Sequence, residues 1–523
     1  MKAVTGAQMG QIDKYSIEKL GIPGMLLMEN AALQIAAHVE AYFEHNPGLP
    51  KDIVIAAGKG NNAGDAFAAA RHLHIKGCNS IIYCLFDKSC LIGDARLNFD
   101  IVERLGVHIR FLDETTDIAG FISEVRRSQA VIDGIFGTGF RGRVKGYLAG
   151  VINAVNENSK YTISIDIASG IEAATGKVPG SCIKADETVT FELPKIGQLV
   201  YPGASYTGKL AVESIGMPGE SIGNIHVNTY LTDLQTVKNI IPSRSAEFNK
   251  GSCGKVAVVT GSQGMAGSGC LVSRASLRTG SGLVYIGAPE SMLAIYQSVV
   301  PEAVGIGLAE QNGVLDGKSA ESILNLIKKC DVAAIGPGLS ANESIYHIID
   351  SAADAMEVPA VLDADALNAL SRNTGIFGKF KKEVVITPHP GEMARLTGLD
   401  TAYIQDNRLE VVRKYSQLWG VTVVLKGAKT LTADSKGTVY INPTGNAGMA
   451  TAGSGDSLTG IISSLIGQGA GAFEAAVAGV FIHGLAGDLA AGRKGQHGLT
   501  ASDIVECIPA AIKKIIKSKQ LFL

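Results

Sequence analysis

Residues 446–460 read NAGMATAGSGDSLTG, and this run carries the strongest structural signal in the sequence. Gly453, Ser454 and Gly455 predict a turn whose backbone N–H groups point at one spot, and the apolar residues that follow predict a helix beginning there. Amides at a helix N-terminus stabilise developing negative charge. Asp456 is then placed to accept a proton from an attacking hydroxyl, and a role as a simple helix cap is the weaker interpretation.

The order glycine, any residue, glycine, aspartate before a helix resembles the ribokinase-like fold. Kinases of that fold transfer phosphoryl groups without a Walker loop, and the sequence contains no Walker loop. Residues 426–430 (KGAKT) follow a predicted strand and resemble the nucleotide-binding side of the same fold. The resemblance therefore implies a nucleotide co-substrate for this half of the chain.

The rest of the second half alternates strands with helices. Apolar, β-branched runs predict strands at 255–260, 283–287, 331–335, 359–363, 383–387 and 421–426. Residues 430–433 and 438–442 predict a hairpin, and the pattern after Gly455 is nearly all helical. This rhythm predicts a three-layer α/β domain.

Loops that follow these strands hold further candidate residues. Gly338 lies in a Gly-Pro-Gly turn. His389 stands between two prolines on a stiff turn and could contact a substrate, although a lone histidine is more often structural. Asp363 and Asp365 follow one strand, and Asp365 is equally well explained as a helix N-cap.

The first half has its own α/β rhythm. Strands are predicted at 52–57, 80–86, 107–111, 130–136 and 161–167, with two more at 188–192 and 209–214. Helices are predicted at 7–20, 24–43, 94–105 and 118–127. A mostly parallel sheet covered on both faces follows. The polar, glycine-containing segment 219–228 separates two predicted domains, 1–218 and 229–523.

Three strands of the first half each end in polar residues and glycine. The first runs into KGNNAGD (59–65), the second ends in Asp133 before the loop GTGFRGR (137–143), and the third ends at Asp166 before Ser169 and Gly170. In open α/β sheets ligands bind outside the carboxyl ends of the strands. Any one aspartate could cap a helix, but three such ends favour a polar pocket.

These motifs resemble the epimerase domain of the bifunctional NAD(P)H-hydrate repair enzymes, which is Rossmann-like and acts on NADHX and NADPHX, the hydrated reduced nicotinamide cofactors. The resemblance implies that Asp166 is catalytic and faces the hydrated ring. It also implies that the substrate is bound by Asn61, Asn62, Ala63, Gly64, Asp65, Gly137, Thr138, Gly139, Phe140, Arg141, Gly142, Arg143 and Asp166.

The same family uses a bound potassium ion, which the resemblance places among Asn62, Asp133 and Ser169. Amide, carboxylate and hydroxyl oxygens suit a monovalent cation near a diphosphate. Ala63 and Ala66 stand where the family usually has glycine. Their methyl groups would crowd the loop if either residue needs a positive φ.

The second half resembles the ADP- or ATP-dependent dehydratase of the same family, so the resemblance covers nearly the whole chain. It implies that Asp456 is the base, that Gly338, His389 and Asp456 bind the substrate, and that Mg²⁺ assists. It also implies that ADP or ATP binds to Lys426, Gly427, Ala428, Lys429, Thr430, Asn446, Ala447, Gly448, Met449, Ala450, Thr451, Ala452, Gly453, Ser454 and Gly455.

The implied activity is a two-stage repair. The dehydratase phosphorylates the ring hydroxyl of the S epimer and expels phosphate to give NADH or NADPH. The epimerase interconverts the R and S epimers, so that no damaged cofactor is stranded. The residues alone leave two alternatives open: a small-molecule kinase fused to a Rossmann-like binding module, or a first half that only binds or assembles.

Composition excludes several other classes of protein. A net charge of −2 and 6% aromatic residues argue against nucleic-acid and membrane-surface binding. Residues 475–492 are apolar but include His483 and Asp488, so we expect a buried helix rather than a membrane span. Eight scattered cysteines without a CxxC pair, and no apolar segment in residues 1–15, favour a cytoplasmic protein. We expect a homo-oligomer, whose order the sequence leaves open.

Overall fold

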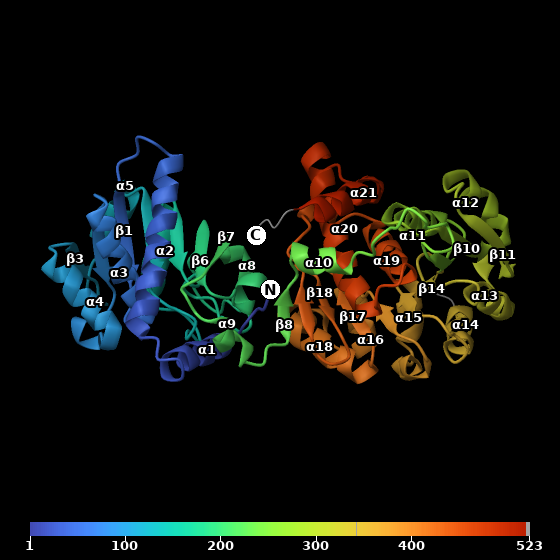
Figure 1. Ribbon diagram of the computed structural model, residues 1–523, viewed down its shortest axis with the longest axis horizontal. Helices are drawn as coiled ribbons and strands as arrows, with labels where there is room; N and C mark the ends of the chain where they lie inside the picture. Colours follow the sequence, from blue (N-terminus) through green and yellow to red (C-terminus); the bar gives the residue numbers. More distant parts are fainter. Residues whose placement is uncertain (341–342, 519–523) are drawn as a thin grey trace. The chain divides into compact units, whose positions relative to one another are not determined.

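The computed structural model describes residues 1–340 and 343–518, which form two compact units (Figure 1). The first unit is Met1–Thr229 and the second begins at Tyr230. Residues 219–228, left between the two predicted domains, belong to the first unit. The reason is local packing, because helix α9 (Gly219–Gly223) places the Ser221 hydroxyl 2.8 Å from that of Ser16.

The first unit is built on a seven-stranded parallel sheet. Its spatial order, β3-β2-β1-β4-β5-β6-β7, reverses direction between β1 and β4. The strands are β1 (Asp52–Ala57), β2 (Asn79–Cys84), β3 (His108–Phe111), β4 (Ala130–Gly134), β5 (Thr162–Ile165), β6 (Glu187–Phe191) and β7 (Lys209–Glu213). All seven predicted strands of this half are present, with ends that differ by one or two residues.

Helices cover both faces of this sheet, as the strand sequences require. Ile53 and Ile55 of β1 enter one core with the first group of helices, whereas Val54 and Ala56 enter the other core with the second group. The first group is α1 (Gly6–Glu18), α2 (Gly24–His45), α3 (Asn61–Ile75) and α4 (Gly93–Arg104). The second group is α5 (Ala119–Arg127) and α6 (Tyr147–Asn158).

The second unit has a ten-stranded mixed sheet in the order β11-β10-β9-β14-β15-β16-β17-β18-β19-β8. Strands from β11 to β17 are parallel, and the predicted hairpin supplies antiparallel β18 and β19. The bounds are β8 (Thr229–Leu231), β9 (Lys255–Val259), β10 (Leu283–Pro289), β11 (Val304–Leu308), β14 (Val332–Ile335), β15 (Ala360–Leu362), β16 (Val384–Ile386), β17 (Thr422–Leu425), β18 (Leu431–Ala433) and β19 (Val439–Ile441).

Strands β8 and β11 were not predicted from the sequence. Both lie at the edges of the sheet, β8 is only three residues long, and β11 carries two glycines. Short or glycine-containing edge strands have weak hydrophobic periodicity.

One group of helices forms the main core of the second unit. It comprises α11 (Ala266–Thr279), α19 (Ser454–Gly467), α20 (Ala472–Lys494) and α21 (Ala501–Lys517), packed on alternate residues of the sheet such as Val256 and Val258. Helices α13 (Ala320–Ile327) and α18 (Arg408–Trp419) also pack on the sheet. Further helices are α14 (Glu343–Ala353), α15 (Asp365–Leu370) and α16 (Pro390–Thr397).

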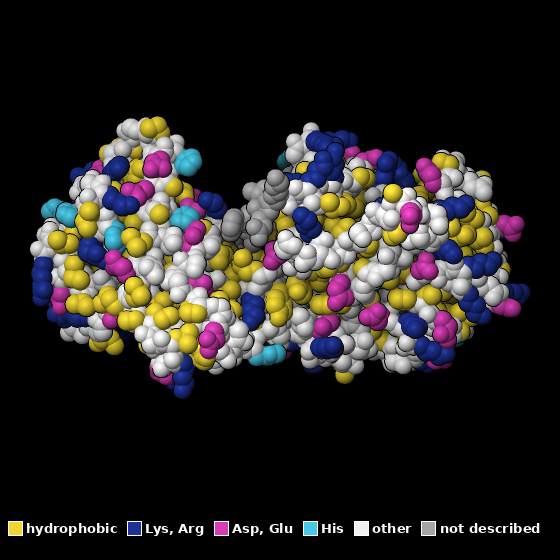
Figure 2. Space-filling model, viewed as in Figure 1, with side chains coloured by type: hydrophobic (Ala, Val, Ile, Leu, Met, Phe, Trp, Pro, Cys, Tyr) yellow, Lys and Arg dark blue, Asp and Glu magenta, His cyan; other side chains and the backbone are white. Residues whose placement is uncertain are grey.

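Helix α20 contains the apolar run predicted to be a buried helix, and the structure confirms that prediction. Among the described residues it is the one helix long and apolar enough to cross a membrane, but 72% of its apolar window is buried inside the unit. It packs between α19 and α21 as a core helix. On the face shown in Figure 2, basic and acidic side chains are interspersed over both units.

Candidate functional sites

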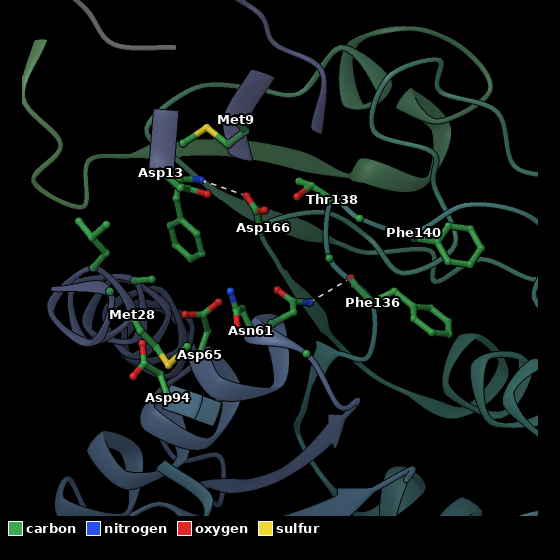
Figure 3. A pocket seen from close by; sticks show the side chains of 18 of the residues that line it. Met9, Asp13, Met28, Asn61, Asp65, Asp94, Phe136, Thr138, Phe140 and Asp166 are labelled. Atoms are coloured by element: carbon green, nitrogen blue, oxygen red, sulfur yellow. Dashed lines mark hydrogen bonds between the residues drawn. The ribbon is translucent and has the colours of Figure 1, made fainter. Parts of the chain in front are cut away.

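A pocket of about 550 Å³ opens in the first unit where β1, β4 and β5 end (Figure 3). This is the edge at which the strand order reverses, where ligands bind in such sheets. Eight of the residues expected to bind substrate line this pocket: Asn61, Asn62, Asp65, Gly137, Thr138, Gly139, Phe140 and Asp166. The remaining five do not line it: Ala63, Gly64, Arg141, Gly142 and Arg143.

Local structure explains why those five lie elsewhere. Ala63 and Gly64 are buried in the first turn of α3, on its core side. Residues 141–143 are exposed, and the Arg141 guanidinium donates hydrogen bonds to the Thr138 and Phe140 carbonyls of its own loop, at 3.2 and 2.6 Å.

The helical start of α3 also answers the question raised by Ala63 and Ala66. Neither residue has a positive φ, so the side chains bring no backbone strain. The methyl group of Ala66 fills space beside Gly134 of β4, where a Cβ would lie only 2.7 Å from it. A methyl group is therefore accommodated here because the neighbouring strand has a glycine.

Asp166 is held in the pocket wall by a buried lysine. It is a non-glycine residue at φ 61°, a strained conformation that tends to mark functional sites. Its carboxylate forms an ion pair with Lys195 and accepts a hydrogen bond from the Thr190 hydroxyl at 3.0 Å. The Lys195 side chain is 1% exposed, so its charge must be balanced locally, and Asp166 balances it.

Three further carboxyl groups, Asp13, Asp65 and Asp94, line the same pocket (Figure 3). Burial raises the pKa of Asp13 to about 6, with Lys195 lowering it and Asp166 raising it to lesser degrees. Burial also raises the pKa of Asp65 well above its usual range, and the charges of Asp166 and Asp13 add to that shift.

Sequence reasoning missed Asp13 and Lys195. Asp13 lies inside an ordinary amphipathic helix and Lys195 lies beyond the predicted strand 188–192, with no glycine-rich motif at either position. Nothing in the local sequence distinguishes these two residues from surface charges.

Asp133, one of the three residues expected to hold potassium, is fully buried and is not among the residues that line the pocket. Its carboxylate accepts hydrogen bonds from the Ser169 hydroxyl at 2.5 Å, the Ser169 amide at 2.9 Å and the Ser164 hydroxyl at 2.8 Å. Nearby, the Asn62 amide donates to the Phe136 carbonyl at 3.0 Å. Among residues 1–340 and 343–518, no lysine or arginine forms an ion pair with Asp133.

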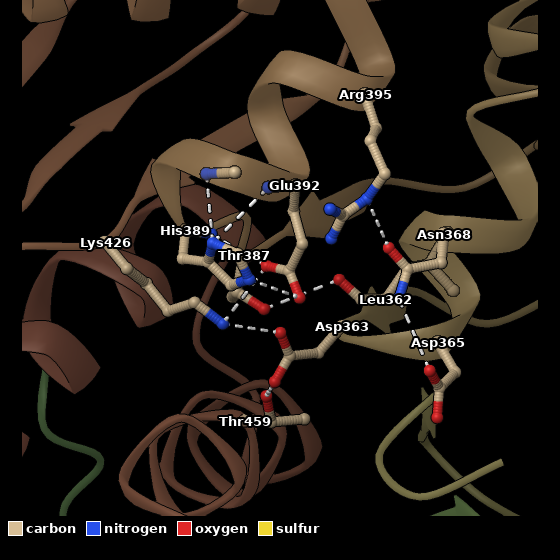
Figure 4. Close-up of polar contacts among 11 residues, drawn as sticks. Leu362, Asp363, Asp365, Asn368, Thr387, His389, Glu392, Arg395, Lys426 and Thr459 are labelled. Carbon is tan, nitrogen blue, oxygen red and sulfur yellow. Dashed lines mark hydrogen bonds and ion pairs between the residues drawn. The ribbon is translucent and has the colours of Figure 1, made fainter. Parts of the chain in front are cut away.

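The second site centres on a buried lysine and aspartate (Figure 4). Asp363 follows β15 and is 1% exposed. The Lys426 ammonium donates to one of its oxygens at 2.8 Å, and the Thr459 hydroxyl donates to the other at 2.7 Å. Although burial raises it, the pKa of Asp363 lies below its usual range because the Lys426 charge and these hydrogen bonds outweigh burial.

Lys426 also approaches Glu392, at 3.7 Å, and is therefore directed into the site. A Cβ built on Gly455 would lie 3.2 Å from the Lys426 ammonium, so this ammonium lies directly against the glycine turn. The sequence had assigned Lys426 to a nucleotide-binding segment without its two acidic partners, which come from the residue after β15 and from helix α16.

Asp456 lies in the first turn of α19, as predicted. Gly453 is the N-cap of α19 and has φ 82°, a left-handed conformation that favours glycine. Burial raises the pKa of Asp456 to about 6, the charge of Asp363 raises it further, and Lys426 and a hydrogen bond from Ser268 lower it. A carboxyl group with a pKa near neutrality suits proton transfer.

His389 and Asp365 behave differently from each other. The Nδ1 atom of His389 accepts a hydrogen bond from the Gly391 amide at 3.0 Å, and the histidine caps α16, so the structural interpretation holds for this ring nitrogen. Half of the His389 side chain remains exposed. The N-cap of α15 is Ala364, so the alternative explanation of Asp365 as a helix N-cap is excluded; its carboxylate instead accepts from the Ser340 amide at 2.8 Å.

Two of the remaining predicted residues are glycines on loops where a side chain would not fit. Gly338 has φ 70°, and a Cβ there would lie 2.7 Å from the Met265 carbonyl oxygen. Gly427 would meet Arg408 at 2.6 Å. Asn446 caps the short helix η5 (Ala447–Met449) and donates to Asp488 at 2.8 Å.

Behind the glycine turn lies a buried histidine that the sequence did not mark as functional. The Nε2 atom of His483, on α20, lies 3.2 Å from the Ser457 hydroxyl and 3.4 Å from that of Ser454. Burial lowers the pKa of His483 to about 4, so the ring is neutral at neutral pH.

Comparisons with known proteins match both halves. The family model described as NAD(P)H-hydrate dehydratase matches residues 256–510, and the model described as YjeF-related protein N-terminus matches residues 25–197. The chain is 40% identical over 516 residues to the bifunctional NAD(P)H-hydrate repair enzyme Nnr of Moorella thermoacetica, covering 98% of this chain and 97% of that one. It is 30% identical to the Escherichia coli Nnr, covering 89% and 86%.

A solved structure agrees with these matches. The ADP/ATP-dependent NAD(P)H-hydrate dehydratase of Bacillus subtilis, co-crystallised with ATP and Mg²⁺, aligns with a TM-score of 0.50 and 30% identity. It covers 55% of this chain and 99% of its own. The two units with their two sites, and relatives matched over nearly their full length, identify the chain as a member of the family of bifunctional NAD(P)H-hydrate repair enzymes, which join an epimerase to an ADP/ATP-dependent dehydratase.

Proposed function

We propose that this chain repairs hydrated NADH and NADPH in two steps, with epimerisation of the R and S forms at the Asp166 pocket and dehydration of the S form at Asp456. The observation that carries the proposal is the second site, where a carboxyl group of raised pKa, a buried ammonium and a glycine turn at a helix N-terminus meet. Each element suits a step that phosphorylates a hydroxyl.

In the dehydration step Asp456 takes the proton of the ring hydroxyl, and that oxygen attacks the terminal phosphoryl group of ADP or ATP, from which AMP or ADP leaves. The amides of Gly453–Gly455 and the Lys426 ammonium lie beside the position of the developing charge. Phosphate is a better leaving group than hydroxide. The lone pair of the ring nitrogen then expels phosphate, and the ring loses a proton to give NADH or NADPH.

We assign nucleotide binding to residues 426–430 and 446–455, and substrate contacts in the second unit to Gly338, His389 and Asp456. Mg²⁺, when bound, would neutralise charge on the phosphates. The carboxylates of Asp363, Asp365 and Asp456 offer the oxygen ligands that this ion prefers. The Asp363 carboxylate and the Lys426 ammonium each stabilise the ionised form of the other, so both groups keep their charges during turnover.

In the first unit we assign substrate binding to the predicted residues that line the pocket, with Asp166 in contact with the hydrated ring. These residues are Asn61, Asn62, Asp65, Gly137, Thr138, Gly139, Phe140 and Asp166. The amides at the start of α3 suit the diphosphate of the cofactor. The apolar wall of the pocket, which includes Met9, Leu27 and Phe191, suits the ring.

We further propose that potassium is held by Asn62, Asp133 and Ser169. The donor set fits because Asp133, Ser169 and Asn62 offer carboxyl, hydroxyl and amide oxygens, and Asp133 has no basic partner in the described part of the chain. Burial raises the pKa of Asp133, and a bound cation would favour its ionised form. Bound there, the ion would supply positive charge beneath the pocket.

Eight free cysteines fit the further proposal of a cytoplasmic location.

The proposal is tested by incubating the full chain with mixed epimers of hydrated NADH and with ADP or ATP, while the absorbance of the reduced nicotinamide is followed. We expect absorbance to return until both epimers are consumed. Recovery that stops when the S epimer is exhausted would contradict the epimerase half. A stable phosphorylated product without NADH would instead support a small-molecule kinase fused to a Rossmann-like binding module.

A further inference from the structure

The pocket of the first unit holds more carboxyl groups than its one buried cation can balance. Lys195 is directed into the pocket, and its ammonium also donates to the Thr190 hydroxyl at 2.9 Å and the Phe191 carbonyl at 3.2 Å. Its ion-pair partner is Asp166. Asp13 and Asp65 line the same pocket without a lysine or arginine partner among residues 1–340 and 343–518. Like charges so close cannot all ionise, so one or more carboxyls keep a proton.

Asp13 is the carboxyl group best placed to use that proton. It comes from α1, which precedes the segment matched by the family model, and its neighbours in the pocket lining include Met9, Ile17 and Phe191. Asp65 is held in α3 and is shifted much further toward the neutral form. Burial raises the pKa of Asp13 only to about 6, which leaves a proton that can be given up and recovered near neutral pH.

We propose that Asp13 is a catalytic residue of the epimerase site, donating a proton to the ring hydroxyl while Asp166, paired with Lys195, receives the proton that must leave. The two roles follow from the partners of each carboxyl group. Asp166 forms an ion pair with the Lys195 ammonium, whereas Asp13 lines the pocket without a basic partner among residues 1–340 and 343–518, and burial raises its pKa to about 6. This inference rests on the epimerase function proposed above.

Asp13 protonates the hydroxyl on the carbon beside the ring nitrogen, the C–O bond breaks, and the nitrogen lone pair forms a C=N bond as water leaves. Water then adds to the opposite face of that carbon, forming a C–O bond while the C=N pair returns to nitrogen. The surplus proton goes to Asp166, and exchange with solvent returns a proton to Asp13.

The test uses the full chain without nucleotide, so that dehydration is off. Purified S epimer is supplied, and formation of the R epimer is followed by chromatography. We expect Asp13→Asn to slow epimerisation about 10²–10⁴-fold, because it removes the acid and keeps the size of the side chain. Glu18→Gln is the matched control, since it neutralises an exposed carboxylate on the same helix. The control should epimerise at the wild-type rate.

A pH profile separates a catalytic acid from a structural group. The kcat/KM of the unmodified chain should fall as pH rises through about 6, because the acid form of Asp13 is lost. Asp13→Asn should lack that limb, and Asp13→Glu should restore it. In ¹⁸O-labelled water the product should carry the label, because the C–O bond is broken and remade.

Three outcomes would overturn this inference. An Asp13→Asn variant with the wild-type rate and the wild-type pH profile would leave the epimerase function standing and remove Asp13 from it. Epimerisation without ¹⁸O incorporation would contradict the C–O cleavage. An unmodified chain that fails to interconvert the epimers would overturn the epimerase function, and this inference with it.

Discussion

The two sites of this protein use the same set of charges on unrelated structural elements. Each has an aspartate that follows a parallel strand, Asp166 or Asp363, paired with a buried lysine. Each also has a further aspartate, Asp13 or Asp456, whose pKa burial raises to about 6. In both sites the lysine forms an ion pair with one carboxylate, and the pKa of the second carboxyl group stays near 6.

The difference lies in what surrounds that second carboxyl group. Asp456 follows a glycine turn at the start of α19, with amides and the Lys426 ammonium beside it, which suits a base acting on a hydroxyl that attacks a phosphoryl group. Asp13 lies in the middle of α1 and faces an apolar wall, which suits an acid. A carboxyl group with the same pKa can therefore act as a base in one site and as an acid in the other. The surrounding dipoles or apolar side chains determine which of its protonation states reacts.

The substitution with the largest expected effect is Asp456→Asn, in the second unit. The change keeps the shape of the helix start but removes the proton acceptor, so we expect dehydration of the S epimer to fall about 10²–10⁴-fold. Nucleotide binding should change little. Epimerisation should persist, because its residues lie in the other unit. Dehydration at a similar rate would show that another acceptor acts, and Asp365 would be the next candidate.

Asp166→Asn makes the corresponding change in the first unit. We expect epimerisation to slow about 10²-fold, the lower end of the usual range for a proton-transfer residue, because Lys195 remains as a hydrogen-bond donor to the amide. Dehydration of purified S epimer is the internal control and should be unchanged. An Asn variant that epimerises at the wild-type rate would mean that Asp166 only positions the substrate.

The pH dependence of dehydration tests whether the carboxyl group of the second unit acts as a base. Because its pKa is raised to about 6, Asp456 loses its base form as pH falls through 6 and not near the usual value of ~4. The kcat for the S epimer should therefore drop about fivefold between pH 6 and pH 5 and change little above pH 7, because the ionised fraction of a group with a pKa near 6 falls from about one half to about one tenth over that interval. A profile flat down to pH 5 would contradict this assignment.

Replacing potassium with a bulky organic cation should have the smallest effect of the four. The ion would lie beneath the first pocket, beside Asp133 and Ser169, so its loss should slow epimerisation severalfold. Dehydration of the S epimer should be spared. If neither rate changes, potassium has no part in the first site.

Much of the fold was predictable because it is encoded locally. The alternation of apolar strands and helices located every strand of the first sheet, and the glycine turn at Gly453 located the start of α19. In the ten-stranded sheet of the second unit the exceptions are β8 and β11, which lack this pattern. An edge strand is stabilised mainly by its partner in the sheet, and so it carries little signal of its own.

The loops at the two sites were predictable for the same reason, whereas the partners of their charged residues were not. Asn61, Thr138, Asp166 and Asp456 lie in glycine-rich segments that directly follow strands or begin helices, so their positions depend on neighbours in the chain. Asp133 follows the same local rule but is taken up by two serines beneath the pocket, which the rule does not foresee.

Protonation states depend on burial and on charges brought from distant parts of the chain, and so they emerged only with the folded structure. Asp13 and Lys195, which are more than a hundred residues apart, both interact with the charge of Asp166, and Lys426 interacts with Asp363 and Glu392, which come from other elements of the second unit. An aspartate can lie at any position on the surface of an ordinary helix, so the sequence of α1 does not show that Asp13 is buried. Its pKa near 6 exists because the fold places it against apolar side chains and a second carboxylate.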